Sequence, residues 1–144
     1  GMPTPLKPVP FFNLAPLENA IARHKVSAKG YDTTLAAKGA ALTPDVKARL
    51  VALAGKTEQA MTTEPGLPGG RGWYRNMIYA PGRFTGYGAK TLPGVREAIE
   101  DERWEDADTY AGYTAKAINA YADLLDQGVT LMGGPAAATS TGAR

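Results

Sequence analysis

Apolar residues recur at alternating four- and three-residue intervals along three stretches of this 144-residue chain. This spacing places them on one face of an α-helix in near-heptad register, so it predicts helices over residues 13–38, 43–63 and 104–132. The first stripe is Leu17, Ile21, His24, Ala28, Tyr31 and Leu35. The last stripe is Ala107, Ala111, Thr114, Ile118, Tyr121 and Leu125. Long helices with this register and short links are typical of helical bundles.

Proline, glycine and capping residues set the expected boundaries of the fold. Asn13 and Thr43 are suited to N-caps, and Gly39 is suited to ending the first helix. A shorter helix is expected over residues 93–102. The predicted fold class is therefore all-α: a four-helix bundle with a long aromatic and glycine-rich loop between the second and third helices.

Three regions are expected along the chain. Residues 1–12 are proline-rich, which excludes a helix and indicates a linker or a strap across the surface. Residues 13–132 form the helical domain. Residues 133–144 consist mostly of small residues and predict a flexible tail.

Composition excludes several classes of protein. The net charge is only +2, which gives no concentrated basic surface for nucleic acid or for an anionic membrane. There is no cysteine, so disulfides and thiolate metal sites are excluded. No apolar run approaches the ~20 residues of a membrane span.

The stretch 63–92 breaks the helical pattern. A loop of about 30 residues inside a compact domain is usually functional or disordered, and its aromatic content argues against disorder. Aromatic and basic residues alternate in it: Arg71, Trp73, Tyr74, Arg75, Tyr79, Arg83, Phe84, Tyr87 and Lys90. The composition predicts a binding loop. The alternative for Trp73, Tyr79 and Phe84 is that they form a small core of the loop itself.

Part of this loop approaches a phosphate-binding motif. The run from Gly82 to Thr91 has glycines ahead of Lys90, but Ala89 stands where the motif requires glycine. A stand-alone domain that binds a small ligand or nucleotide through this loop is therefore the alternative hypothesis.

A longer pattern resembles a known family. The sequence Tyr79-Ala80-Pro81, then Tyr87-Gly88, then Leu92-Pro93-Gly94 opening a helix, is similar to the signature loop of the transferrin receptor-like dimerisation domain found in glutamate carboxypeptidase II-like zinc peptidases. The lead-in Val9-Pro10-Phe11-Phe12-Asn13 before a long helix also matches. The resemblance covers residues 9–132, and its specific part is residues 78–99.

The resemblance implies a non-catalytic domain that forms a homodimer and contacts a peptidase domain of the same polypeptide. Its 71–91 loop would line the substrate pocket of that peptidase domain, which would also hold the zinc. Relatives carry an asparagine-lysine-tyrosine triplet in the loop. The matching positions here are Thr85, Gly86 and Tyr87, so only the tyrosine is retained. Arg83 and Lys90 are the nearby cations and are the candidates to replace the missing lysine, although the motif assigns neither.

No catalytic or metal site is expected in this chain itself. A two-metal peptidase site needs several histidine and carboxylate ligands, and the chain has one histidine, His24. No cofactor is expected, and the isolated chain is predicted not to be an enzyme. The sequence leaves the compartment open; a bacterial parent peptidase would place the domain in the periplasm or outside the cell.

Part of the last stripe has two interpretations. Its central residues suit either packing inside one chain or a seam between two copies, and the sequence does not separate these. The residues are Thr114, Ile118, Tyr121 and Leu125.

Overall fold

The computed structural model describes residues 1, 3, 8, 10–63, 65, 66, 77, 79–81 and 89–137. The helices in this part are α1 (Ala15–Lys38), α2 (Pro44–Ala54), α3 (Thr57–Ala60), α4 (Pro93–Glu100) and α5 (Trp104–Leu131), with a 3-10 turn η1 (Gly39–Ala41) after α1. Two short strands, β1 (Tyr79–Pro81) and β2 (Ala89–Thr91), pair antiparallel with Ala80 opposite Lys90. The predicted helical class is confirmed, and the small ladder is an addition within the 63–92 stretch.

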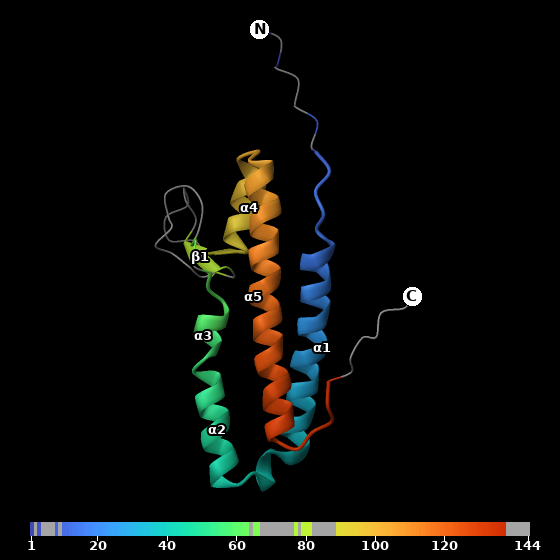
Figure 1. Cartoon of the computed structure of the whole chain (residues 1–144), viewed down its shortest axis with the longest axis vertical. Coiled ribbons are helices and arrows are strands. Elements are labelled where there is room, and N and C mark those ends of the chain that lie inside the picture. Colours follow the sequence, from blue (N-terminus) through green and yellow to red (C-terminus); the bar gives the residue numbers. More distant parts are fainter. Residues whose placement is uncertain are drawn as a thin grey trace, which may run out of the picture.

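The two longest helices, α1 and α5, lie side by side and run in the same direction (Figure 1). Successive contacts occur in the same order along both helices. In the first, His24 stacks on Tyr121 with ring centroids 5.1 Å apart. One heptad later, the Tyr31 ring fills the space beside Gly128, where a Cβ atom would come within 2.6 Å of the ring. The two contacts join residues with the same separation in sequence, so α1 and α5 stay in register between them.

Small residues at seven-residue spacing form the centre of this contact. Ala20, Ser27 and Thr34 are buried on α1, and Ala115, Ala122 and Val129 are buried on α5. Short side chains let two helix backbones approach closely, and the seven-residue repeat keeps them on the facing side of each helix. The α1–α5 pair is therefore built on close backbone packing more than on large apolar side chains.

The predicted stripe of α1 needs one correction. Leu17 is buried as expected, but Leu35 is 42% exposed, so its assignment to the buried face was wrong. The most buried positions follow the Ala20, Ser27 and Thr34 row instead. Periodicity favoured the larger apolar residues, whereas the close contact with α5 selects the small ones.

The start and end of α1 follow local signals. The N-cap is Leu14, one residue later than predicted, although the Asn13 side chain still accepts a hydrogen bond from the Ala15 amide at 3.0 Å. Pro16 lies in the first turn, where its missing amide hydrogen costs no helical bond. Gly39 is the C-cap, as predicted.

The second predicted helix is interrupted, so its single span over residues 43–63 was wrong. It begins as expected, with the Thr43 hydroxyl accepting from the Val46 amide at 3.2 Å and Pro44 in the first turn. It ends at Gly55, whose amide donates back to the carbonyls of Val51 and Leu53. The short α3 then continues in nearly the same direction (Figure 1).

Helix α4 packs against the N-terminal half of α5. Gly94 lies directly against the Tyr110 ring, and a Cβ atom there would come 2.5 Å from the ring. Arg103, between the two helices, forms ion pairs with Asp101 at 3.2 Å and with Asp106. Residues of α1, α4 and α5 share one core with Met77. It consists of Leu17, Ala20, Met77, Val95, Tyr110, Ala111, Ala115, Ala117 and Ile118.

The residues directly before α1 and directly after α5 pack on the helices. Phe12 stacks on Trp104 with ring centroids 6.0 Å apart, which joins the residues before α1 to the start of α5. After α5, Gly133 adopts a positive φ of 75°, and the Gly134 amide donates to the Val129 carbonyl at 2.9 Å. Gly134 lies against Thr34, so the chain turns back beside α1.

The two glycines at positions 94 and 112 should respond oppositely to alanine. Gly112 is exposed on α5 with no neighbour within 4 Å, so Gly112→Ala should stabilise the fold by up to about 1 kcal/mol through helix propensity. Gly94→Ala should destabilise it by about 1–3 kcal/mol, because the buried Tyr110 ring has to move. Urea denaturation midpoints measure both. A Gly94→Ala variant as stable as wild type would contradict the described α4–α5 contact.

Candidate functional site

The candidate site is the place where the described parts of the 63–92 stretch meet α4 and the N-terminal half of α5 (Figure 1). Its central residue is Tyr110, whose hydroxyl donates a buried hydrogen bond of 2.7 Å to the Gly66 carbonyl. Tyr113, one turn further along α5, meets the Tyr110 ring edge-on at 5.4 Å. The hydrogen bond between Tyr110 and Gly66 fixes the beginning of the 63–92 stretch to α5.

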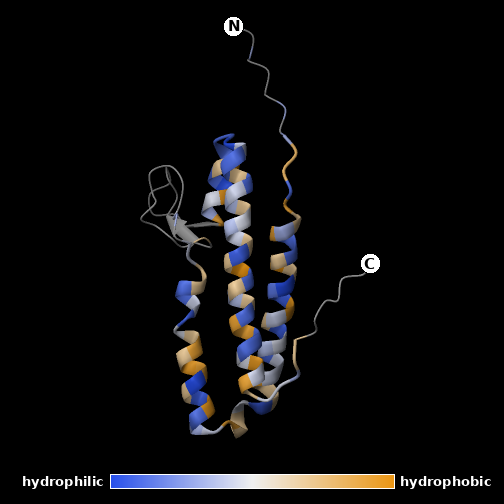
Figure 2. Ribbon diagram, in the orientation of Figure 1, coloured by the Kyte–Doolittle hydropathy of each residue, from blue (hydrophilic) through white to orange (hydrophobic). Residues whose placement is uncertain are grey.

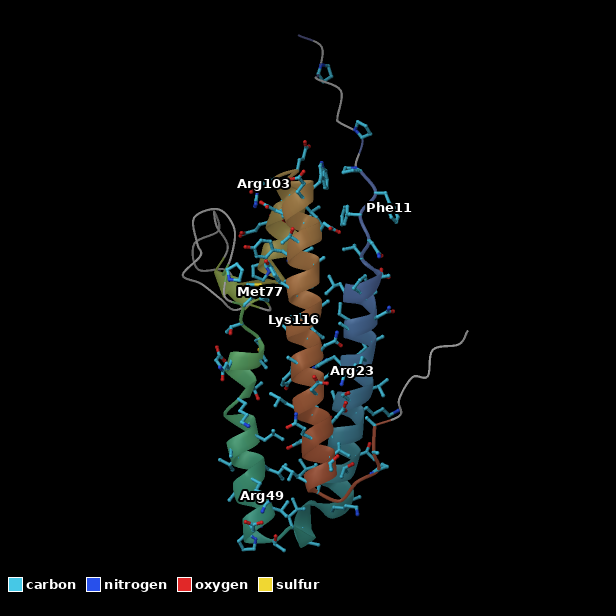
Figure 3. The ribbon with its side chains drawn as sticks, viewed as in Figure 1. Phe11, Arg23, Arg49, Met77, Arg103 and Lys116 are labelled. Atoms are coloured by element: carbon cyan, nitrogen blue, oxygen red, sulfur yellow. The ribbon has the colours of Figure 1, made fainter. Side chains whose placement is uncertain are left out.

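A second anchor holds the middle of the stretch. Met77 is fully buried, and its amide donates to the Met61 carbonyl at 2.8 Å. Figure 3 shows Met77 beside α5, and it shares the core with residues of α1, α4 and α5. A buried methionine fills irregular gaps well, which suits a junction of loop, α4 and α5. The residues between Gly66 and Met77 are therefore bounded by two contacts with the helical body.

The last part of the stretch leads directly into α4. Strands β1 and β2 bracket residues 82–88, and Leu92 then turns the chain in the left-handed conformation with φ of 48°. Pro93 begins α4 immediately afterwards, and Pro93 and Val95 are buried. Residues 82–88 thus start and finish at one two-stranded ladder next to a packed helix.

Burial sets the electrostatics of the anchor. Desolvation raises the pKa of the Tyr110 hydroxyl above its ordinary value, and the nearby Asp106 carboxylate adds to the shift. The neutral, protonated phenol is the form that donates to Gly66, so the environment favours the form that makes the bond.

The predicted loop residues lie mostly outside the described part of the chain. Arg83, Thr85 and Tyr87 belong to residues 82–88, so their roles stay predictions. Lys90 lies in β2, opposite Ala80. The phosphate-loop hypothesis depends on the same residues and also stays a prediction.

The four residues that were predicted to form either the core or a dimer seam lie on the inner side of α5. Thr114 is fully buried, and Ile118 is 8% exposed and belongs to the core. Tyr121 stacks on His24. Leu125 is half-buried and lines a groove between α1, α2 and α5. All four lie against other parts of the same chain, and their role in a seam between two copies stays a prediction.

Sequence reasoning missed one polar cluster. Arg23 projects from α1 toward α5 (Figure 3) and pairs with Asp123 at 2.5 Å and Asp126 at 3.0 Å. It also donates to the Asn119 carbonyl at 3.2 Å, and the Asp123 hydrogen bond raises the pKa of the guanidinium. The i, i+3 spacing of the two aspartates was the available signal, but nothing local pointed to a partner about 100 residues away.

The described residues hold no obvious place for a metal. Within them, no three histidine, cysteine or acidic side chains form a group able to hold an ion. His24 is engaged in the stack with Tyr121. In the same part of the chain, no helix has the length and apolar character needed to cross a membrane.

Comparison with known proteins gives the family. The profile of the transferrin receptor-like dimerisation domain matches residues 12–126. The chain belongs to this family. The match extends from Phe12 to Asp126, so it includes α1 to α4 and most of α5.

Two curated relatives are named as peptidases. A probable glutamate carboxypeptidase LAMP1 of Arabidopsis thaliana is 32% identical over 100 residues, which cover 65% of this chain and 14% of that protein. A probable glutamate carboxypeptidase of Arthroderma benhamiae is 37% identical over 67 residues, covering 46% of this chain and 9% of that protein. This transferrin receptor-like dimerisation domain thus corresponds to a small part of much longer proteins.

Removing the Tyr110 hydroxyl should lower stability in a pH-dependent way. Tyr110→Phe leaves the buried Gly66 carbonyl without its donor, which should cost about 1–2 kcal/mol at pH 7. Because the folded-state pKa of Tyr110 is raised, its contribution is complete below about pH 10 and declines as the pH rises further. Urea midpoints of both proteins between pH 7 and pH 11 should therefore converge at the alkaline end.

Tyr31→Phe, on the far part of α1, is the control and should change the midpoint little at pH 7. If Tyr110→Phe is as stable as wild type at neutral pH, the hydroxyl does not anchor the loop.

Proposed function

We propose that this chain is the homodimerisation and accessory domain of a glutamate carboxypeptidase-like peptidase. The family match over residues 12–126 carries the proposal, together with two relatives named as probable glutamate carboxypeptidases. The helices α1, α2, α4 and α5 are the four members of the proposed bundle. In this role the helical body joins two copies and carries no chemistry of its own.

The loop has a separate role in this proposal. Residues 71–91 line the substrate pocket of a peptidase domain in the same polypeptide. The buried Tyr110–Gly66 bond, the buried Met77 and the β1–β2 ladder support this role, because they hold the loop's base on a rigid helix pair. A contact residue on a well-anchored loop can be positioned without the entropy cost of ordering it at each binding event.

Within that loop, Tyr87 is the proposed contact residue. Its phenol is suited to donating a hydrogen bond to a substrate carboxylate, and Arg83 or Lys90 to supplying positive charge for it. Thr85 stands where relatives have asparagine, so the polar character of that position is kept while the amide is lost.

Zinc, if the parent protein uses it, belongs to the peptidase domain. The described residues of this chain do not fit a zinc site, since the only histidine stacks on Tyr121 and no acidic group joins it in a cluster.

Substitution of Tyr87 tests the loop proposal in a full-length peptidase that carries this domain. Tyr87→Phe should raise KM for a peptide with a free terminal carboxylate about tenfold, which is the typical effect of losing one charged hydrogen bond. Steady-state hydrolysis measures it, with Tyr31→Phe as a control that should leave KM unchanged. Unaltered hydrolysis by the Tyr87→Phe enzyme would show that the loop does not contact substrate through this residue.

A further inference from the structure

Two residues that are not glycine adopt a positive φ in the described part of the chain, and they stand at the two ends of α4. Leu92, directly before the helix, has a φ of 48° and a ψ of 54°. Glu102, just after the helix, has a φ of 55°. This left-handed conformation brings Cβ close to the following carbonyl oxygen, so a residue with a side chain keeps it only where its surroundings require it.

The left-handed Glu102 has a local cause. The Glu102 amide donates to the Ile99 carbonyl at 3.1 Å, and the Arg103 amide donates to the Ala98 carbonyl at 2.8 Å. These two bonds form the common motif that ends a helix with one left-handed residue. The turn is exposed and hydrophilic, as Figure 2 shows at the junction of α4 and α5. Leu92 has no such cause, because a residue that starts a helix and precedes a proline is normally extended.

Tertiary contacts on both sides fix the chain at Leu92. On one side, Thr91 ends β2 and is paired with Tyr79 of β1. On the other side, α4 starts immediately after Leu92, and Gly94 lies directly against the Tyr110 ring, so the helix has no room to move toward α5. Leu92 is the only residue between β2 and α4. The change of direction from strand to helix therefore depends on its two backbone angles.

The side chain of Leu92 joins this turn to the core. It is half-buried and packs against the core that α1, α4 and α5 share with Met77. Glycine would adopt the same angles without strain, but it would also adopt many others. For leucine, a change of these angles would also withdraw the side chain from the core, so packing holds the turn in one conformation.

We infer that Leu92 is a positioning residue: its left-handed backbone, held by the packing of its side chain, sets the direction in which the β1–β2 ladder leaves α4. The ladder brackets residues 82–88, which include the proposed contact residue Tyr87. Where it concerns substrate, the inference rests on the proposed role of the loop, and it names the residue that orients that loop. A contact residue must be held within about 0.5 Å of its productive position, so a small change of the turn weakens binding.

The simpler alternative is that Leu92 only fills space in the core. Methionine and isoleucine separate the two roles, because both are apolar and close to leucine in volume. Isoleucine is branched at Cβ, and a branched residue fits the left-handed conformation poorly. Methionine is unbranched there, so it keeps both the packing and the backbone angles. Leu92→Ile therefore changes the backbone preference, whereas Leu92→Met leaves it unchanged.

Amide hydrogen exchange in this chain measures the turn without any substrate. Leu92→Ile should speed exchange of the hydrogen-bonded amides of β1 and β2 by about tenfold, because the strained turn opens more often. Leu92→Met should leave these rates within about twofold of wild type. Leu53→Ile is the matched control: Leu53 is half-buried in the regular helix α2, so its replacement should not affect the ladder. Unchanged protection of α1 and α5 shows that each variant is folded.

Steady-state kinetics of a full-length peptidase that carries this domain measure the consequence for substrate. Leu92→Ile should raise KM about fivefold and leave kcat within about twofold, because the loop binds substrate and carries no reacting group in the proposed function. Leu92→Met should keep both wild-type values.

The outcomes separate this inference from the proposed function. Equal exchange rates in the ladder for Leu92→Ile and Leu92→Met would overturn the inference, since the backbone of Leu92 would then not hold the ladder. A loosened ladder with unchanged KM would also overturn it, in an enzyme whose Tyr87→Phe variant does raise KM. If the ladder loosens only in Leu92→Ile and neither that variant nor Tyr87→Phe changes KM, the loop–substrate contact is wrong and the positioning of the ladder stands. A selectively loosened ladder with a raised KM supports both.

Discussion

The close packing of α1 on α5 is the interaction on which the other parts of this domain depend. Ala20, Ser27 and Thr34 face α5 at heptad spacing, and the buried Ala115 and Ala122 allow the two backbones to approach. Arg23 reaches across to Asp123 and Asp126 at the edge of this contact. Such ion pairs are partly exposed and contribute little stability, so they favour the register while packing holds the pair together.

A parallel helix pair within one chain requires a return path, and this path shapes the rest of the domain. Helix α2 and then the 63–92 stretch lead the chain back to the start of α5, where α4 packs on it (Figure 1). The loop therefore leaves and rejoins the body near Tyr110, the residue that bonds Gly66 and touches Gly94. The return helix α2 is less covered than α1 and α5, since none of its residues is fully buried.

The sequence predicted the long helices well because their periodicity and caps are local signals. The ends of α1 and α5 fell within one or two residues of expectation, at Gly39 and Met132. It failed at Leu35, whose exposure depends on which α1 residues fit closely against α5. It also failed at Gly55, where the glycine that ends α2 was passed over in favour of the apolar spacing. Tyr110 was overlooked at the site because it lies between two stripe positions, and its role depends on Gly66, 44 residues away. The loop residues were found only through family resemblance, since spacing alone does not assign a substrate contact.

Amide hydrogen exchange tests the central claim that α1 and α5 form the stable body of the domain. The account predicts the slowest exchange in the facing parts of α1 and α5, whose small residues are buried. It also predicts faster exchange in α2, which has no buried residue. Equal protection of all three helices would contradict it.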